Sequence, residues 1–309
     1  MYHGIINVYK EAGYTSHDVV AKLRGICKQK KIGHTGTLDP DAVGVLPVCL
    51  GNGTRLCDML TGHSKEYIAV LRLGIVTDTQ DISGKVLEEK PVNVPEEEVE
   101  SAVMAFLGES MQVPPMYSAL KVNGKKLYEL ARQGKEVERP ARPVTVYEIQ
   151  ILEKSHPEYT IRVKCSKGTY IRTLCHDIGQ ALGCGGVMMS LKRTRVGDFL
   201  IEDAYRLSEL QMLADEGRLE EAVCPVENMF EDLPALTVKE SSFKALANGN
   251  QLKRTEVILK DGLKAEGYGD EESFRVYSHQ DQFYGIFRYQ KERDLFLPVK
   301  LFLKDRELP

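Results

Sequence analysis

The 309-residue sequence predicts an α+β protein with a small β-rich domain at its C-terminal end. Three observations favour this class. Strand-like and helix-like segments are mixed along residues 4–200, prolines at 225 and 234 mark a boundary, and beyond residue 236 the pattern changes to one short helix and several strands. We therefore expect a larger domain over residues 1–232 and a separate small domain over residues 233–309.

Hydrophobic periodicity places the individual elements. Alternating or β-branched apolar runs predict strands over residues 4–9, 66–73, 85–87, 144–152, 159–165, 187–196, 274–277, 283–288 and 295–303. Apolar residues at helical spacing predict helices over residues 17–28, 170–182, 207–223 and 241–247. Another helix is expected to begin near Pro95 and to bury Val99, Val103, Phe106 and Leu107. We also expect Thr54 to cap a short helix, and Tyr170 and Arg172 to lie in the first turn of the helix at 170–182.

A loop rich in glycine and proline interrupts this pattern between residues 31 and 54. Its five glycines and two prolines exclude a long helix or strand. Asp39 lies in this loop directly before Pro40, which restricts the preceding backbone to extended conformations. A carboxylate held on such a stiff loop can act as a nucleophile, a general base or a metal ligand, or can simply form an Asx turn.

Composition excludes several classes of protein. No apolar run approaches the roughly 18 residues that span a bilayer, and the N-terminus lacks the basic and apolar regions of a signal peptide. The seven cysteines are an odd number without a C-x-x-C pair, which indicates reduced thiols. We expect a cytoplasmic protein that binds no metal, since no cluster of metal-ligand spacing is present. Phosphate-binding glycine motifs of nucleotide enzymes are also absent from the sequence.

Charge is unevenly distributed although the net charge is only −4. Residues 121–143 hold seven basic side chains against three glutamates, and residues 162–196 hold seven against one aspartate. Residues 202–240 hold eleven acidic side chains against three basic ones, so an acidic segment masks two basic ones in the total. Such runs are often only solvated faces, but local basic patches are also what a nucleic-acid backbone binds.

Five motifs that follow one another in order resemble the TruB family of bacterial tRNA pseudouridine-55 synthases. They are residues 33–40 (GHTGTLDP), 65–67 (KEY), 73–81 (LGIVTDTQD), 112–119 (QVPPMYSA) and 165–172 (CSKGTYIR), and the similarity covers about residues 4 to 200. The sequence departs from the family at Lys10 and Glu11, where the family commonly has Lys-Pro.

The resemblance implies a fold and an activity. It implies a pseudouridine-synthase-type mixed, largely antiparallel sheet flanked by helices, with a PUA-like RNA-binding domain at residues 233–309. The implied enzyme is an isomerase that flips uridine 55 out of the T-arm loop of tRNA, cuts its N1–C1′ bond, and rejoins the base through C5. It implies no cofactor, tRNA as the partner, no membrane, and a monomer.

Roles for individual residues follow from the same motifs. Asp39 resembles the catalytic carboxylate and Arg172 its basic partner, while Tyr170 resembles a second pocket tyrosine that could take the C5 proton. Tyr67 resembles the ring that stacks on the target base, Leu191 an apolar wall of the pocket, and His34 the histidine that fills the gap left by the flipped nucleotide. The stretch 117–143 resembles an insertion that grips RNA phosphates, here through Lys121, Lys125, Lys126 and Arg132.

Each assignment has a plainer alternative. Tyr67, Tyr170 and Leu191 can be ordinary core residues, and Arg172 can be a surface cation at a helix start. His34 can be a hydrogen-bonded histidine that holds the glycine-rich turn, a role compatible with the other one. At the level of function, the alternatives are a non-catalytic RNA-binding or tRNA-folding protein on the same scaffold, and a carboxylate-dependent hydrolase of a small substrate. Asp39 and Arg172 favour the isomerase over a pure binding protein, which has no need of either side chain.

Overall fold

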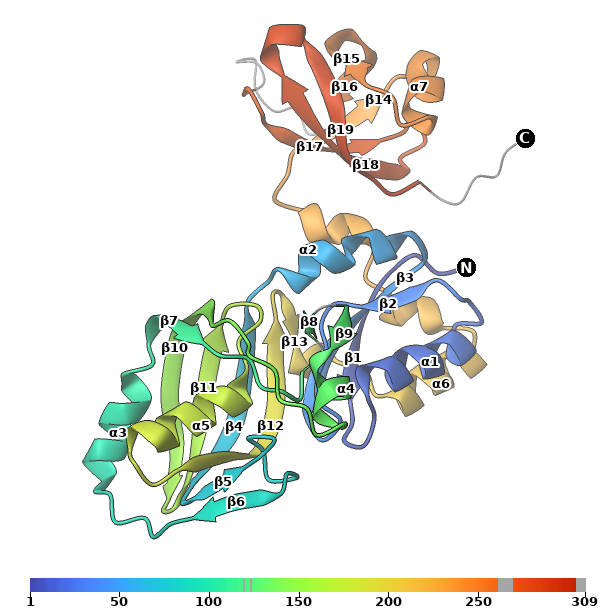
Figure 1. Ribbon diagram of the computed structural model, residues 1–309. Helices are drawn as coiled ribbons and strands as arrows, with labels where there is room; N and C mark the ends of the chain where they lie inside the picture. Colours follow the sequence, from blue (N-terminus) through green and yellow to red (C-terminus); the bar gives the residue numbers. More distant parts are fainter. Residues whose placement is uncertain (119, 123, 261–268, 304–309) are drawn as a thin grey trace.

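Two β-sheets follow one another along the chain in the computed structural model, which describes residues 1–118, 120–122, 124–260 and 269–303 (Figure 1). The larger sheet has nine strands, and its main path has the order β1-β3-β12-β4-β11-β10-β7. These strands are β1 (Gly4–Lys10), β3 (Val43–Leu50), β12 (Gly186–Val196), β4 (Lys65–Leu73), β11 (Glu158–Cys165), β10 (Arg142–Ser155) and β7 (Gly108–Gln112). Two short strands complete it: β2 (Ile32–His34) pairs with β3, and β13 (Phe199–Leu200) pairs with β12.

The pairing of these strands is antiparallel except between β3 and β12, which run parallel. The expected mixed, largely antiparallel sheet is therefore confirmed. The parallel contact is made possible by Gly44, whose φ of +109° suits glycine. A Cβ atom on Gly44 would lie 2.1 Å from the carbonyl oxygen of Arg193, so no other residue allows β3 to approach β12 this closely.

Helices cover the large sheet at both ends (Figure 1). Helices α1 (Ser16–Ile26) and α6 (Leu207–Asp215) pack with β1 and β3 around an apolar core that includes Val19, Leu23 and Leu210. Helices α3 (Glu96–Met104) and α5 (Ile171–Ala181) pack against β4, β10, β11 and β12. All four helices were predicted from the sequence. Helix α6 ends earlier than predicted, because the chain turns at Gly217 before a 3₁₀ helix, η3 (Leu219–Ala222).

Four local expectations are wrong. The stretch from residue 31 to 54 is not a single loop, because β3 is an eight-residue strand inside it and only residues 35–42 form the loop that carries Asp39. Leu107 is 49% exposed, because α3 ends at Met104 and the chain turns before Leu107 can reach the core. Thr54 lies inside a 3₁₀ helix, η1 (Gly51–Leu56), and its hydroxyl donates to the Gly51 carbonyl instead of capping α2 (Cys57–Thr61). Tyr170 is the extended N-cap residue of α5 and not part of its first turn.

The remaining elements of residues 1–232 are short. A hairpin of β5 (Ile75–Thr77) and β6 (Val86–Glu89) follows β4, and a second hairpin of β8 (Lys121–Val122) and β9 (Lys125–Lys126) leads into α4 (Leu127–Ala131). Two more 3₁₀ helices are η2 (Ile201–Asp203) and η4 (Val226–Phe230). None of the helices in the described ranges combines the length and the apolar character that a bilayer crossing requires.

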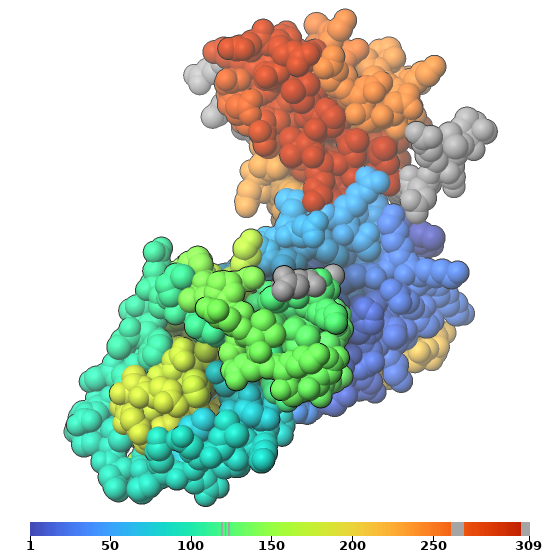
Figure 2. All heavy atoms as spheres, viewed as in Figure 1, coloured from blue at the N-terminus to red at the C-terminus, as the bar shows by residue number. Residues whose placement is uncertain are grey.

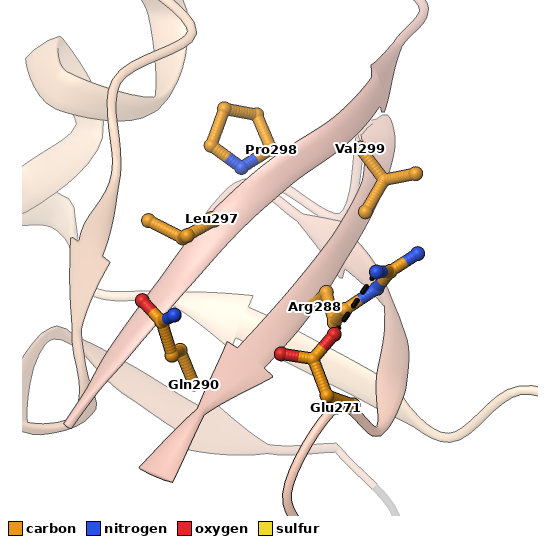
Figure 3. Close-up of a pocket in the computed structure, with 6 residues that line it drawn as sticks. All are labelled: Glu271, Arg288, Gln290, Leu297, Pro298 and Val299. Atoms are coloured by element: carbon orange, nitrogen blue, oxygen red, sulfur yellow. Dashed lines mark hydrogen bonds and ion pairs between the residues drawn. The ribbon is translucent and has the colours of Figure 1, made fainter. Parts of the chain in front are cut away.

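The second sheet has six strands in the order β15-β19-β18-β17-β14-β16. They are β14 (Ala235–Val238), β15 (Leu252–Lys253), β16 (Val257–Leu259), β17 (Ser273–Tyr277), β18 (Phe283–Gln290) and β19 (Leu295–Leu301), with α7 (Phe243–Ala247) and the 3₁₀ helices η5 (Glu240–Ser242), η6 (Arg254–Glu256) and η7 (Lys291–Arg293) between them. Its outer face carries an open depression of 360 Å³ along β18 and β19, at whose edge Arg288 pairs with Glu271 at 3.0 Å (Figure 3).

Aromatic side chains join this second unit to the first. Phe230 from η4 packs with Phe283 and Phe302 in one apolar cluster that also contains Leu56 and Leu60. The Asn52 amide donates to the Phe302 carbonyl at 2.7 Å. The junction therefore rests on the segment that directly follows β3, the strand into which the glycine-rich loop runs.

Candidate active site

The loop that carries Asp39 connects β2 to β3 and is fixed from beneath by β1 and α1. The Ser16 hydroxyl accepts a hydrogen bond from the Leu38 amide at 2.9 Å, and the buried Lys10 ammonium donates to the Pro40 carbonyl at 2.8 Å. A turn within the loop is closed by the Ala42 amide, which donates to the Asp39 carbonyl. Asp39 thus projects from a short segment whose backbone is tied on both sides of it.

Arg172 faces Asp39 with two of its three guanidinium nitrogens. Its Nε lies 3.1 Å from Asp39 Oδ2, and its Nη2 lies 3.3 Å from Oδ1. The Arg172 side chain is only 6% exposed, while that of Asp39 is 38% exposed and open to an incoming group. Two parallel N–H···O bonds to a carboxylate set the orientation of the carboxylate as well as stabilising its charge. The structure therefore brings together two residues that are 133 positions apart in sequence.

The other hydrogen bonds of the Arg172 guanidinium go to residues for which the sequence motifs predicted no role. Nη1 donates to Asp81 Oδ2 and to the Thr79 carbonyl, both at 3.2 Å, and Nη2 donates to the Tyr117 carbonyl at 2.9 Å. Asp81 is itself held by the Thr79 hydroxyl. These partners hold the buried Arg172 guanidinium in one orientation. In that orientation its Nε and Nη2 point at the Asp39 carboxylate.

The electrostatic environment of Asp39 is mixed. Burial raises the pKa of the Asp39 carboxyl above its ordinary value, and Asp81 and Asp41 add to this rise, while Arg172 and Lys10 oppose it. The carboxylate is thereby less solvated than a surface aspartate, which increases its reactivity toward a carbon centre or a proton.

Tyr67 and Leu191 lie on one face of the large sheet, under the Asp39 loop. They come from the adjacent strands β4 and β12 and share an apolar cluster with Leu38 and Ala42, the residues that flank Asp39 and Pro40. Burial raises the pKa of the Tyr67 hydroxyl, so the side chain is a neutral phenol. An apolar floor with a flat ring beside a carboxylate is the type of surface on which a planar base can rest.

Tyr170 is the N-cap residue of α5, two positions before Arg172. Its backbone is clamped by the Gln112 amide, which donates to the Tyr170 carbonyl at 3.0 Å and accepts from the Tyr170 amide at 2.8 Å. Burial raises the pKa of Tyr170, and the nearby charges of Arg172 and Asp39 act on it in opposite directions. Gln112 therefore fixes the start of α5, the helix that also carries Arg172.

His34 lies at the end of β2, at the entrance to the loop. Its Nδ1 accepts a hydrogen bond from the Gly36 amide at 3.3 Å, and burial lowers its pKa, so the ring is neutral near pH 7. This contact matches the plainer alternative, a histidine that holds the turn, and leaves the other edge of the ring for further contacts.

Comparison with known proteins identifies the family to which this arrangement belongs. Residues 24–171 match the model of the TruB family pseudouridylate synthase N-terminal domain, and residues 172–231 match the tRNA pseudouridylate synthase B C-terminal domain. The tRNA pseudouridine synthase B of Lachnoclostridium phytofermentans is 52% identical over 97% of this chain and 100% of its own length. That of Alkaliphilus oremlandii is 48% identical over 83% of this chain and 85% of its own length.

The chain belongs to the TruB family of pseudouridylate synthases. It is accordingly a pseudouridine-forming isomerase. Solved structures agree: a chain in the crystal structure of a Cbf5–Nop10–Gar1 complex superimposes with a TM-score of 0.69 at 30% identity, over 97% of this chain and 85% of the other. A chain in an H/ACA ribonucleoprotein bound to a substrate RNA containing 2′-deoxyuridine gives 0.68 at 28% identity, over 99% of this chain and 86% of the other.

Residues 117–143, the stretch expected to grip RNA, are much more exposed than the residues around Asp39. Of the described residues from 120 to 143, Leu127 alone is buried. Lys126 and Arg132 lie over the Tyr128 ring, each 5.4 Å from its centroid, and Lys125 is exposed. The side chain of Lys121 lies outside the described part of the structure. Figure 2 shows this stretch as a raised mass beside the residues of α5.

Proposed function

We propose that this TruB protein isomerises uridine 55 in the T-arm loop of tRNA to pseudouridine, with Asp39 as the catalytic carboxylate. One observation carries the proposal: Asp39 is held by the two-nitrogen contact with buried Arg172, above an apolar floor that contains Tyr67. The tRNA substrate is that named for the relatives with 43–52% identity.

The proposed chemistry needs nothing beyond this site. The N1–C1′ bond of the uridine breaks, the uracil turns over in the pocket, and its C5 bonds to C1′. The C5 proton leaves, N1 gains a proton, and the atoms and electrons of substrate and product balance. Asp39 acts either on the ribose C1′ or on C6 of the base, and Tyr170, with its phenol near Asp39, is the proposed acceptor of the C5 proton.

The target base has to leave its stack before it can reach Asp39. We propose that Tyr67 stacks on the extruded uracil, that Leu191 forms the apolar wall beside it, and that His34 fills the gap in the RNA. The exposed cations Lys125 and Arg132, together with the half-buried Lys126 and with Lys121, would hold the phosphates of the T-arm. We also propose that residues 233–309 form a PUA-like RNA-binding domain beside a catalytic domain of residues 1–232, and that the protein is a cytoplasmic monomer, in keeping with its seven free thiols.

Replacing the carboxylate tests the proposal. Asp39→Asn removes the charge with little change in shape, and we expect no detectable tritium release from unmodified tRNA labelled at uridine C5, while tRNA affinity stays within about tenfold, or about 1.4 kcal/mol. Asp58→Asn, an exposed aspartate on α2 outside the loop, is the matched control and is expected to retain wild-type turnover. Full activity of purified Asp39→Asn would overturn the assignment. Mapping the product by carbodiimide-dependent reverse-transcription stops tests the T-arm position.

A further inference from the structure

Arg193 is a buried cation beneath the active site that the site chemistry described above does not use. It lies on β12 two residues after Leu191, on the same face of the sheet, and is only 2% exposed. Within the described residues it forms no ion pair with a carboxylate. Burying an unpaired guanidinium is costly unless its N–H groups are hydrogen-bonded, so its partners show what it holds in place.

The partners of Arg193 lie on both sides of the Asp39 loop. Its Nε donates to the Val45 carbonyl on β3 at 2.7 Å, which is a short, strong contact. Its Nη2 and Nη1 reach the carbonyls of Gly36 and Thr37 at 3.4 and 3.5 Å. One side chain therefore joins the strand that follows the loop to the segment that leads into Asp39.

The same guanidinium also lies beside Tyr67. The two residues are direct cross-strand partners in the pairing of β12 with β4, and the guanidinium and the phenol are close enough for each to shift the pKa of the other. Gly44 opposes Arg193 on the other side, where the missing Cβ allows β3 and β12 to come close. Arg193 thus lies between the strand of the stacking ring and the strand that continues the catalytic loop.

We propose that Arg193 is a positioning residue that couples the Asp39 loop to Tyr67, and so fixes the distance between the catalytic carboxylate and the ring that supports the target base. The inference rests on the roles proposed above for Asp39 and Tyr67. It differs from the role of Arg172, which contacts the carboxylate itself, because Arg193 donates to backbone carbonyls on both sides of the loop and lies beside Tyr67 as its cross-strand partner.

A double-mutant cycle tests this coupling. Arg193→Met removes the fork of donors, and Tyr67→Phe removes the hydroxyl but keeps the ring. We expect Arg193→Met to lower kcat by about 100-fold, as a misplacement near 1 Å does, with the tRNA Kd within about threefold. The double variant should be no more than about twofold slower than Arg193→Met, because both changes remove the same interaction between the guanidinium and the phenol.

The matched control is Lys192→Met, which removes the neighbouring cation from the exposed face of β12 and should retain wild-type kcat. Two results would overturn the proposal. The first is a double variant whose loss of kcat equals the product of the two single losses, and the second is an Arg193→Met enzyme with kcat within about twofold of wild type. Wild-type and Asp39→Asn enzymes are measured in the same assay. If the wild type is active and Asp39→Asn is inactive, the proposed function holds and a negative result concerns only the role of Arg193.

A conservative variant keeps the test valid if Arg193→Met does not fold. Arg193→Lys retains the charge and can reach one carbonyl, so we expect a folded protein with kcat between those of wild type and Arg193→Met, and the cycle is then run with Arg193→Lys against Tyr67→Phe. Thermal unfolding of each variant is measured first, and turnover is compared well below the lowest midpoint. Additive losses in this second cycle would also reject the coupling.

Discussion

The candidate active site around Asp39 and the proposed RNA-binding stretch at residues 117–143 are both rich in basic residues, but the basic side chains differ in burial and in partners. Around Asp39 the cations are buried: Arg172, Arg193 and Lys10 donate to carbonyl and carboxylate oxygens of the protein. In the stretch at residues 117–143, Lys125 and Arg132 are exposed. The comparison teaches that equal local charge in a sequence can serve either to shape a site or to attract an anion.

Burial decides which of these two roles a cation has. A buried guanidinium must be hydrogen-bonded by the protein, so it fixes the backbone around it and is not free for phosphate. An exposed ammonium contributes little to folding and remains available to a polyanion. Variants of the first group should therefore change kcat, and variants of the second group should change RNA affinity and its salt dependence.

The largest effect is expected at Arg172. Arg172→Gln leaves Asp39 without its bidentate partner, and we expect kcat to fall by at least about 100-fold while tRNA affinity changes little. Because Arg172 lowers the pKa of Asp39 against the effect of burial, its removal raises that pKa further. Any residual activity that needs the ionised carboxylate should then appear only at higher pH than in the wild type. A pH–rate profile measures this shift, and a profile displaced toward lower pH would contradict it.

The next effect concerns binding. Replacing Lys125, Lys126 and Arg132 together by glutamine should weaken tRNA binding by about tenfold at low salt and reduce the slope of log K against log[salt] by up to about 3. At saturating tRNA, kcat should stay within about twofold of wild type. The affinity is measured by filter binding over a salt series.

A control with the same change in net charge uses Lys90, Lys154 and Lys164, each of which forms an ion pair with a glutamate. Neutralising these three lysines should leave the salt slope unchanged. Equal slopes for the variant at residues 125, 126 and 132 and the wild type would show that phosphates bind elsewhere on the protein.

Local patterns in the sequence predicted the elements well but not the partners of the site residues. Alternation predicted β4, β11 and β12. The glycines and prolines at residues 31–54 marked the loop at Asp39, but they hid the strand β3 that follows it. The burial of Arg172 did not follow from its position at a helix start, because it depends on Asp81, Thr79 and Tyr117, which lie far away in sequence.

Arg193 was missed for a related reason. In sequence it is one basic residue in a basic run. The alternation of β12 separates it from the exposed Lys192, and a register shift between Arg193 and Arg195 leaves Arg195 exposed as well. That alternation was a usable signal, since a charged residue on the inward face of a buried strand requires internal partners. Gln112 and Lys10 gave no such local signal, because their partners come from α5 and from the loop at Pro40.

The smallest effect on turnover is expected at Lys10, the buried cation that reaches the loop only through backbone carbonyls. Burial lowers the pKa of Lys10 from 10.5 to about 8, so between these values the unfolded chain binds a proton that the folded chain does not. The free energy of unfolding contributed by this residue should therefore rise as pH increases from 8 to 10.5. From pH 8 to 10.5 we expect the free energy of unfolding of the wild type to rise by about 1–3 kcal/mol relative to that of Lys10→Met. The kcat of Lys10→Met should be less than about tenfold below that of the wild type. Urea unfolding of both proteins at pH 7.5 and pH 10 measures the difference, and a difference that does not change with pH would show that Lys10 keeps its ordinary pKa in the folded protein.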